Sequence, residues 1–148
     1  MSVPVEPDFV LIKIGDGAGP EVFTMACGLQ DVTVNTAVNT ADRFVRDCAN
    51  PGETPNRKVK ATGKQMDVNA SGFIDKTQLA AFHTAQGVVK NYKIEYYSLD
   101  GTNAGLLYGT YAGAFMLTTL NQSVPRENQA SVEISLANHG AWTWTPAV

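Results

Sequence analysis

One stretch of the sequence has the residue types and spacing of a calcium-binding loop. Asp67, Asn69 and Ser71 offer side-chain oxygens at alternate positions before Gly72, which is how an EF-hand places its ligands around a turning glycine. The position that should hold a bidentate glutamate is Gln78, and the preceding segment alternates like a strand where the motif requires a helix. We therefore interpret these residues as turn formers ahead of a helix, and we expect no metal site.

The other candidates for chemistry are isolated. His83 and His139 have no serine or cysteine in a glycine elbow near them in the sequence, and the carboxylates are too scattered to pair as an acid and a base. The glycine-rich residues 15–19 are not followed by the GK[ST] of a phosphate loop. We expect no catalytic residue, no cofactor and no enzymatic activity.

Nucleic-acid binding is also disfavoured. The chain carries 11 basic and 14 acidic residues, a formal net charge of -3, so counterion release from a phosphate backbone gives little drive to bind. Five tyrosines, at positions 92, 96, 97, 108 and 111, have only Lys90 and Lys93 nearby in the sequence. Packing in a core or an interface explains these aromatic residues better than stacking on bases.

Size and composition indicate one domain, residues 1–148. Hydrophobic residues make up 44% and charged residues 17%, a charge-poor composition that suggests surface covered by partners. Cys27 and Cys48 are far apart and form no metal or disulfide pattern, which fits a reducing cytoplasm. We expect no leader peptide and no membrane contact, because no apolar run approaches about 20 residues.

The alternation of apolar and polar residues along the chain predicts mostly strands. Residues 9–14 and 21–26 form a hairpin; residues 31–38 place valines inside and Asp31, Thr33 and Asn35 outside. Residues 58–68 form a strand with a β-bulge near Gly63. Its lysines, Lys58, Lys60 and Lys64, project outward together.

Residues 39–57 are predicted to be a long excursion loop, because Asn50-Pro51-Gly52 and Thr54-Pro55-Asn56 interrupt any periodicity. Long loops without structure of their own are usually functional or mobile. Phe44 and Val45 lie in the middle of this segment, and we expect them to dock on a neighbouring molecule. The loop and the residues before Phe9 would be mobile in the free subunit and become ordered on assembly.

A helix is predicted over residues 75–86, capped by Asp75 with Gln78 in return and stopped by Gly87. Leu79 and Phe82 form its buried stripe. Further strands follow at residues 92–97 and 106–119, at residues 131–136 and in a last short strand with Trp142 and Trp144; Ser131, Glu133 and Ser135 form a second outward polar row. About eight strands and one helix predict a mainly β fold (α+β by count), a β-sandwich or barrel of two packed sheets with one flanking helix.

This layout resembles the major tail tube proteins of long-tailed phages and related gene transfer agents. The resemblance covers most of the chain and rests on the two-strand start, the long segment 39–57 and the capped helix. It also rests on the strand at residues 90–94 and on the late stretches at residues 113–116, 123–128 and 131–135.

The resemblance implies hexameric rings that stack into a tube and conduct DNA without binding it specifically, with other tail proteins at the tube ends. The location would be the virion tail, assembled in the bacterial host cytoplasm. The candidates for facing the lumen are the polar rows, either Asp31, Thr33 and Asn35 or Ser131, Glu133 and Ser135, and the sequence leaves open which of them does. Arg43, Phe44, Val45 and Arg46 would contact the next ring.

Two alternatives stay open. A non-polymerising β-sandwich that decorates a virion or mediates adhesion would share the fold class and the missing active site, and self-assembly of the isolated subunit discriminates between them. An enzyme with a site built from distant residues would show a deep polar pocket around His83, His139 or the scattered acids.

Overall fold

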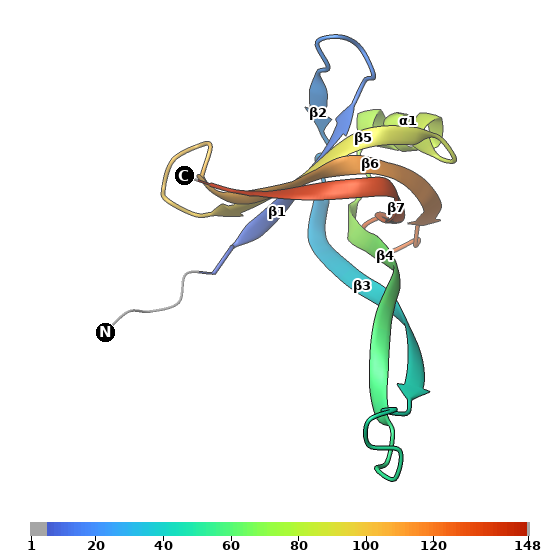
Figure 1. Ribbon diagram of the computed structural model, residues 1–148. Helices are drawn as coiled ribbons and strands as arrows, with labels where there is room; N and C mark the ends of the chain where they lie inside the picture. Colours follow the sequence, from blue (N-terminus) through green and yellow to red (C-terminus); the bar gives the residue numbers. More distant parts are fainter. Residues whose placement is uncertain (1–5, 148) are drawn as a thin grey trace.

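A computed structural model describes residues 6–147 and arranges them as one antiparallel sheet with one helix (Figure 1). The strands follow the order β2-β1-β5-β6-β7-β4-β3 across the sheet. The elements are β1 (Phe9–Gly15), β2 (Phe23–Met25), β3 (Leu29–Val45), β4 (Asn56–Phe73), α1 (Lys76–Ala85), β5 (Val89–Ser98), β6 (Leu106–Ser123) and β7 (Ser131–Pro146). The predicted mainly β fold with one helix is confirmed, as is the opening hairpin of β1 and β2.

The sheet is continuous, whereas two packed sheets were expected. β6 and β7 run through the whole fold, and β6 bends at register shifts between Gly113 and Phe115 and between Leu117 and Thr119. The curled sheet brings β1 into contact with β3, although these strands share no hydrogen-bonded ladder. Curling lets one sheet supply both sides of the core.

The strand count within residues 6–147 is seven because the last two predicted strands are one. β7 continues from Ser131 to Pro146 through a bulge at residues 139–141, where Gly140 has a φ of 86°. The bulge interrupts the alternation, so the sequence pattern breaks although the strand does not.

The core lies inside the curl. Its buried side chains come from every long strand and from the helix: Ile12, Leu29, Met66, Val68, Ala70, Phe82, Tyr92, Ile94, Phe115, Leu117, Val132, Ile134 and Leu136. In register, Val34 pairs with Val68, and Val68 with Leu136. One face of alternating strands thus supplies the interior.

Helix α1 closes one end of this core. The Thr77 amide donates to the Asp75 carboxylate over 3.0 Å, which confirms the predicted N-cap. Gln78, Phe82 and Ala85 form the buried side of the helix, while Leu79 is only half-buried. No helix of residues 6–147 has the length and hydropathy that a membrane span requires.

The predicted loop at residues 39–57 is wrong at both of its ends, which are strands. β3 continues to Val45 and pairs with β4 as far as Asn56, so only residues 46–55 form the connecting turn. We call residues 38–64 the arm; Figure 1 shows it projecting from the rest of the molecule, which we call the body. The predicted bulge near Gly63 is confirmed, since Asn39 pairs with Gly63 and Thr40 with Ala61.

The three lysines of the arm do not share a face. The bulge leaves Thr62 without a partner position on β3, so the parity of β4 changes there. Lys64, opposite Val38, lies on the face that continues the core, whereas Lys58 and Lys60 lie on the opposite face. The prediction that all three project together is therefore wrong.

Candidate functional site

The two polar rows recognised in the sequence lie on one face of the sheet. Asp31 pairs with Ser71 and Ser71 with Glu133, so the three side chains form a row across β3, β4 and β7. Thr33, Asn69 and Ser135 form the next row. We call this surface, on the side of the sheet away from the core, the polar face; β6 extends it with Thr119, Asn121 and Ser123.

The polar face is hydrophilic and acidic. Ser135 donates from its hydroxyl to the Asn69 side-chain oxygen over 2.8 Å, which links β7 to β4. Asp31, Asp67 and Glu133 are its charged residues, all exposed carboxylates. None of the positions paired in these rows holds a lysine or arginine, so the face presents negative charge and neutral hydroxyl and amide groups.

Asp67, Asn69 and Ser71 lie along β4 with their side chains on this polar face. They form neither a calcium loop nor the turn that we inferred, because β4 continues to Phe73. A strand spaces alternate side chains along a line and does not wrap them around an ion. Within residues 6–147, no cluster of three or more His, Cys, Asp or Glu residues could hold a metal ion.

The arm ends in exposed residues of mixed character. The exposed fraction is 70% for Phe44 and 43% for Val45. Arg46 folds back into the turn and donates to the Pro51 carbonyl over 2.6 Å. The Ala49 amide donates to Asp47 over 2.9 Å and lowers the pKa of that carboxyl, so the turn is held by its own polar groups.

Charge is divided unevenly between arm and body. The arm carries six of the eleven basic residues and three of the fourteen acidic ones. Its formal charge is therefore +3, and the other residues of the chain sum to -6. The net charge of -3 for the whole chain hides this separation, which becomes apparent only once the structure defines the arm.

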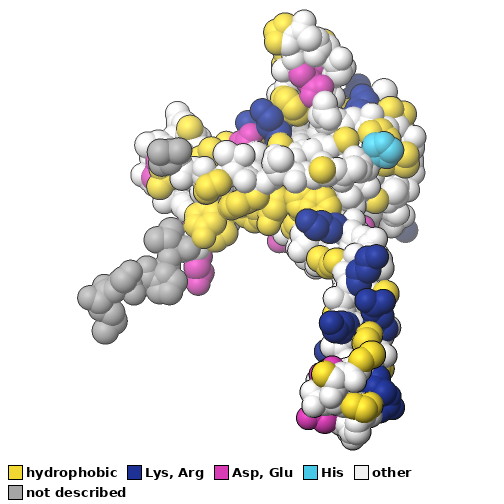
Figure 2. Space-filling view, in the orientation of Figure 1, with side chains coloured by type: hydrophobic (Ala, Val, Ile, Leu, Met, Phe, Trp, Pro, Cys, Tyr) yellow, Lys and Arg dark blue, Asp and Glu magenta, His cyan; other side chains and the backbone are white. Residues whose placement is uncertain are grey.

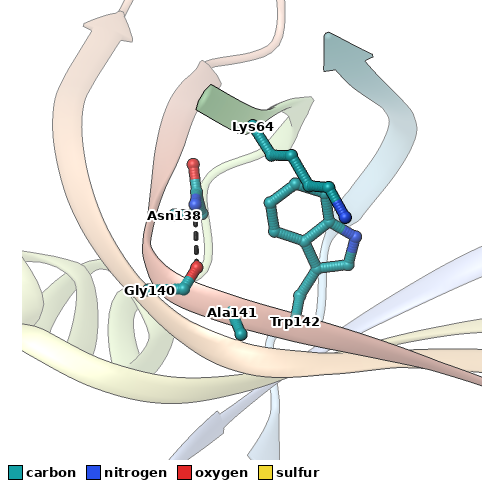
Figure 3. A pocket seen from close by; sticks show the side chains of 5 residues that line it. All are labelled: Lys64, Asn138, Gly140, Ala141 and Trp142. Carbon is teal, nitrogen blue, oxygen red and sulfur yellow. Dashed lines mark hydrogen bonds between the residues drawn. The ribbon is translucent and has the colours of Figure 1, made fainter. Parts of the chain in front are cut away.

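The junction of arm and body contains a cavity of about 420 Å³ lined by Lys64, Asn138, Gly140, Ala141 and Trp142 (Figure 3). The Asn138 side chain accepts from the Met66 amide over 3.0 Å and donates to the Gly140 carbonyl over 2.9 Å. It therefore ties β4 to the bulge of β7 where the two strands separate. The cavity lining has no nucleophile paired with a base.

The two histidines also form no pair of nucleophile and base with the described residues near them. His83 is exposed on α1, and its Nε2 lies 3.5 Å from the side-chain nitrogen of Gln122. His139 is exposed in the β7 bulge. Neither residue lines the cavity at the junction.

A groove in the body was missed by the sequence reasoning. Pro7, Tyr96, Tyr108, Tyr111 and Trp144 line a hollow of about 290 Å³, which we call the aromatic groove. The shared parity of Trp142 and Trp144 was visible in the sequence, but nothing there showed that the surface opposite Trp144 would stay uncovered.

Comparison with known proteins agrees with this architecture. The sequence model of the phage tail tube protein family matches residues 8–143. No curated protein sequence matches the chain.

Among solved structures, the tail of an empty gene transfer agent particle with C6 symmetry superposes with a TM-score of 0.65 at 21% identity, covering 92% of this chain and 95% of that one. A chain of the sheath-tube complex of an extracellular contractile injection system also gives 0.65, at 15% identity and 97% and 93% coverage. The SPP1 tail tube gives 0.65 at 12% identity, with 98% and 81% coverage. The family match extends over nearly all of the sheet and the helix, and the chain belongs to the phage tail tube protein family, as a structural subunit of a tail tube.

Proposed function

We propose that six copies of the chain form a ring, that rings stack into a tube, and that the polar face lines the lumen through which DNA passes. The C6 symmetry of the similar gene transfer agent tail supports the number six. A contact that closes laterally and repeats axially generates a tube from one subunit type. The function of such a protein is structural and involves no chemical reaction.

The observation that carries the lumen assignment is the register of the polar face. Four strands in the order β6-β7-β4-β3 present hydroxyls, amides and three carboxylates on one side and the core on the other. DNA carries dense negative charge, so an acidic wall repels it and leaves no site where it would stick. Asp31, Thr33 and Asn35, with Ser131, Glu133 and Ser135, are the proposed lumen residues.

The arm is the proposed contact between rings, through Arg43, Phe44, Val45 and Arg46. A two-stranded hairpin is marginally stable alone in water, and Phe44 is 70% exposed in the subunit. Burial against a neighbouring ring would remove this apolar surface from water. The position of these residues at the end of the arm supports the assignment.

The ends of the tube would bind other tail proteins, and assembly would occur in the bacterial cytoplasm. Solved structures similar to this chain include a tube-terminating cap and a baseplate of the anti-feeding prophage, which supports capped ends. Cys27 and Cys48 are both free and exposed, as suits assembly in a reducing compartment.

Electron microscopy of the purified protein over a concentration series, with light scattering for mass, tests the proposal. We expect hollow tubes, and a reconstruction with six subunits per ring and Asp31 and Glu133 on the channel wall. A channel lined by the outer side of β1 and β5 would contradict the lumen assignment. A subunit that stays monomeric at every concentration, also with tail-end proteins added, would contradict assembly and favour the decoration-module alternative.

A further inference from the structure

The core-facing side of the sheet stays uncovered beyond the arm junction. β4 pairs with β7 only from Asp67 to Phe73, whereas β7 continues past Asn138 paired with β6 alone. At this end of the sheet the inner-facing side chains of Tyr96 on β5, Tyr111 on β6 and Trp144 on β7 are therefore only partly covered, whereas the inner faces of the same strands nearer the helix are buried in the core. Figure 2 shows a band of hydrophobic side chains along the body here, above the arm.

The aromatic groove is the best-defined part of this band. The ring centroids of Tyr111 and Trp144 lie 4.6 Å apart, and Tyr96 lies 5.8 Å from Trp144 and 6.0 Å from Tyr111. Trp144 keeps an exposed fraction of 41% and Tyr108 one of 42%. Preformed clusters of aromatic side chains with open faces are typical of protein contact sites.

The arm carries an exposed apolar surface of its own. Phe44 pairs with Arg57, and Val59 pairs with Asp42, so Phe44 and Val59 are diagonal neighbours on one side of the hairpin. Both are more than half exposed. Arg57 lies beside Phe44, with its Nη1 3.9 Å from the Asp42 carboxylate. The arm thus presents an aromatic side chain next to a guanidinium.

Charge complementarity selects a second copy of this chain as the occupant of the groove. Glu6 and Asp8 flank Pro7 at the groove, while the arm has a formal charge of +3 and the rest of the chain -6. Opposite charges on the two surfaces favour encounter between arm and body and disfavour contact of arm with arm or body with body.

The arm projects away from the body (Figure 1). From Val38 to Val45 its β3 strand extends about 25 Å at the usual rise per residue. Donor and acceptor are therefore separate patches of one subunit, and their contact is heterologous and repeats in one direction.

We propose that the aromatic groove receives the arm of another subunit, with Phe44 and Val59 against Tyr96, Tyr111 and Trp144 and the arm arginines near Glu6 and Asp8. This inference rests on the proposed function for its biological setting, and it names the surface that the arm contacts. Aromatic anchors seated in an apolar pocket dominate many interfaces.

Thiol cross-linking of the full-length chain tests the contact. Cys48 is a natural exposed thiol in the arm turn, and Cys27→Ser removes the other. Leu106→Cys places the second thiol at the start of β6 on the side of the groove, and Val124→Cys places it beyond the other end of β6 as a matched control; both positions are exposed. The Cys27→Ser chain alone measures cross-linking between arms.

With a short bismaleimide, we expect dimers and higher species on a denaturing gel for the Leu106→Cys chain, and only background for the Val124→Cys chain. Adding Phe44→Asp to the first chain should lower its cross-linking at least about tenfold, because an interface anchor is lost. If tubes form but cross-linking at position 106 does not exceed that at position 124, the inferred contact is refuted while the proposed tube stands. Cross-linking at position 106 with no tubes, also after tail-end proteins are added, refutes the proposed tube and supports the contact.

Discussion

Strands β3 and β4 run through both the body and the arm, and the two regions differ in what covers these strands. In the body, Met66 and Val68 of β4 are fully buried against β7 and the core. In the arm, the same strand pairs only with β3, and Val59 is 54% exposed. The ladder of hydrogen bonds continues across the junction, but the buried apolar surface ends there.

This difference separates two kinds of stability. Backbone hydrogen bonds between strands contribute little to the free energy of unfolding where no core is buried, and a lone hairpin is only marginally stable in water. The body should therefore determine the free energy of unfolding of the subunit, whereas the arm should affect assembly. Substitutions in the two regions test this separation.

The largest effect is expected from Phe115→Ala in the body. Phe115 is completely buried and packs edge-to-face on Tyr92 at a centroid distance of 6.1 Å. Its truncation should lower the free energy of unfolding by about 3–5 kcal/mol, since transfer and cavity costs add. Urea denaturation followed by tryptophan fluorescence measures this. A loss below about 1 kcal/mol would mean that the core relaxes or that stability lies elsewhere.

Phe44→Asp in the arm should give the opposite result. The side chain is 70% exposed in the subunit, so its free energy of unfolding should change by less than about 0.5 kcal/mol. Assembly should weaken by about 2 kcal/mol or more per contact, because a charge replaces an interface anchor. Sedimentation and electron microscopy against wild type measure assembly. Unchanged tubes, or a destabilised subunit, would contradict the division between arm and body.

Two glycines sharpen the comparison without changing charge. At Gly72, at the end of the β3–β4 ladder farthest from the arm, an added Cβ would overlap the Gly28 carbonyl and lie 2.7 Å from the Leu29 Cα. At Gly52, in the arm turn, it would meet no atom within 4 Å. Gly72→Ala should cost about 1–3 kcal/mol, and Gly52→Ala should be nearly neutral. If the Gly72→Ala and Gly52→Ala proteins had equal midpoints in thermal unfolding, the backbone at Gly72 would be able to shift and accommodate the added Cβ.

The sequence predicted the polar face better than the arm, and the reason is physical. Between Asp31 and Asn35 one side of the strand, with Val32 and Val34, packs against the core, so apolar and polar residues alternate. Along residues 39–45 both sides of the hairpin are exposed, and no alternation marks a strand that buries neither face. The turn predicted around Pro51 is present, but the predicted loop was drawn too long and included residues of β3 and β4 that pair with each other.

Other features depend on contacts that a linear pattern does not contain. The single curled sheet follows from bulges in β6 and β7, and only Gly140 gave a local signal for one of them. The aromatic groove exists because β4 leaves β7 at Asn138, which is a property of the topology. The roles of the polar face and the arm in assembly stay predictions.

The smallest effect at neutral pH is expected from Tyr92→Phe, deep in the body. Tyr92 is 1% exposed, and its hydroxyl has no hydrogen-bond partner among the described residues. Removing an unpaired buried hydroxyl should leave the free energy of unfolding within about 0.5 kcal/mol of wild type or raise it slightly, since no bond is lost.

At high pH the same substitution should have a larger consequence. Burial raises the pKa of Tyr92 to about 12, from an ordinary value of 10.0. Between these values the unfolded chain releases the phenolic proton and the folded chain retains it, so stability falls as the pH rises above 10. The phenylalanine variant lacks this contribution and should lose less stability than wild type over that window. Denaturation midpoints of both proteins from pH 9 to pH 11.5 measure the difference. Parallel curves for the two proteins would mean that the Tyr92 hydroxyl reaches water in solution. The core of the body would then exclude water less completely than its contrast with the exposed arm requires.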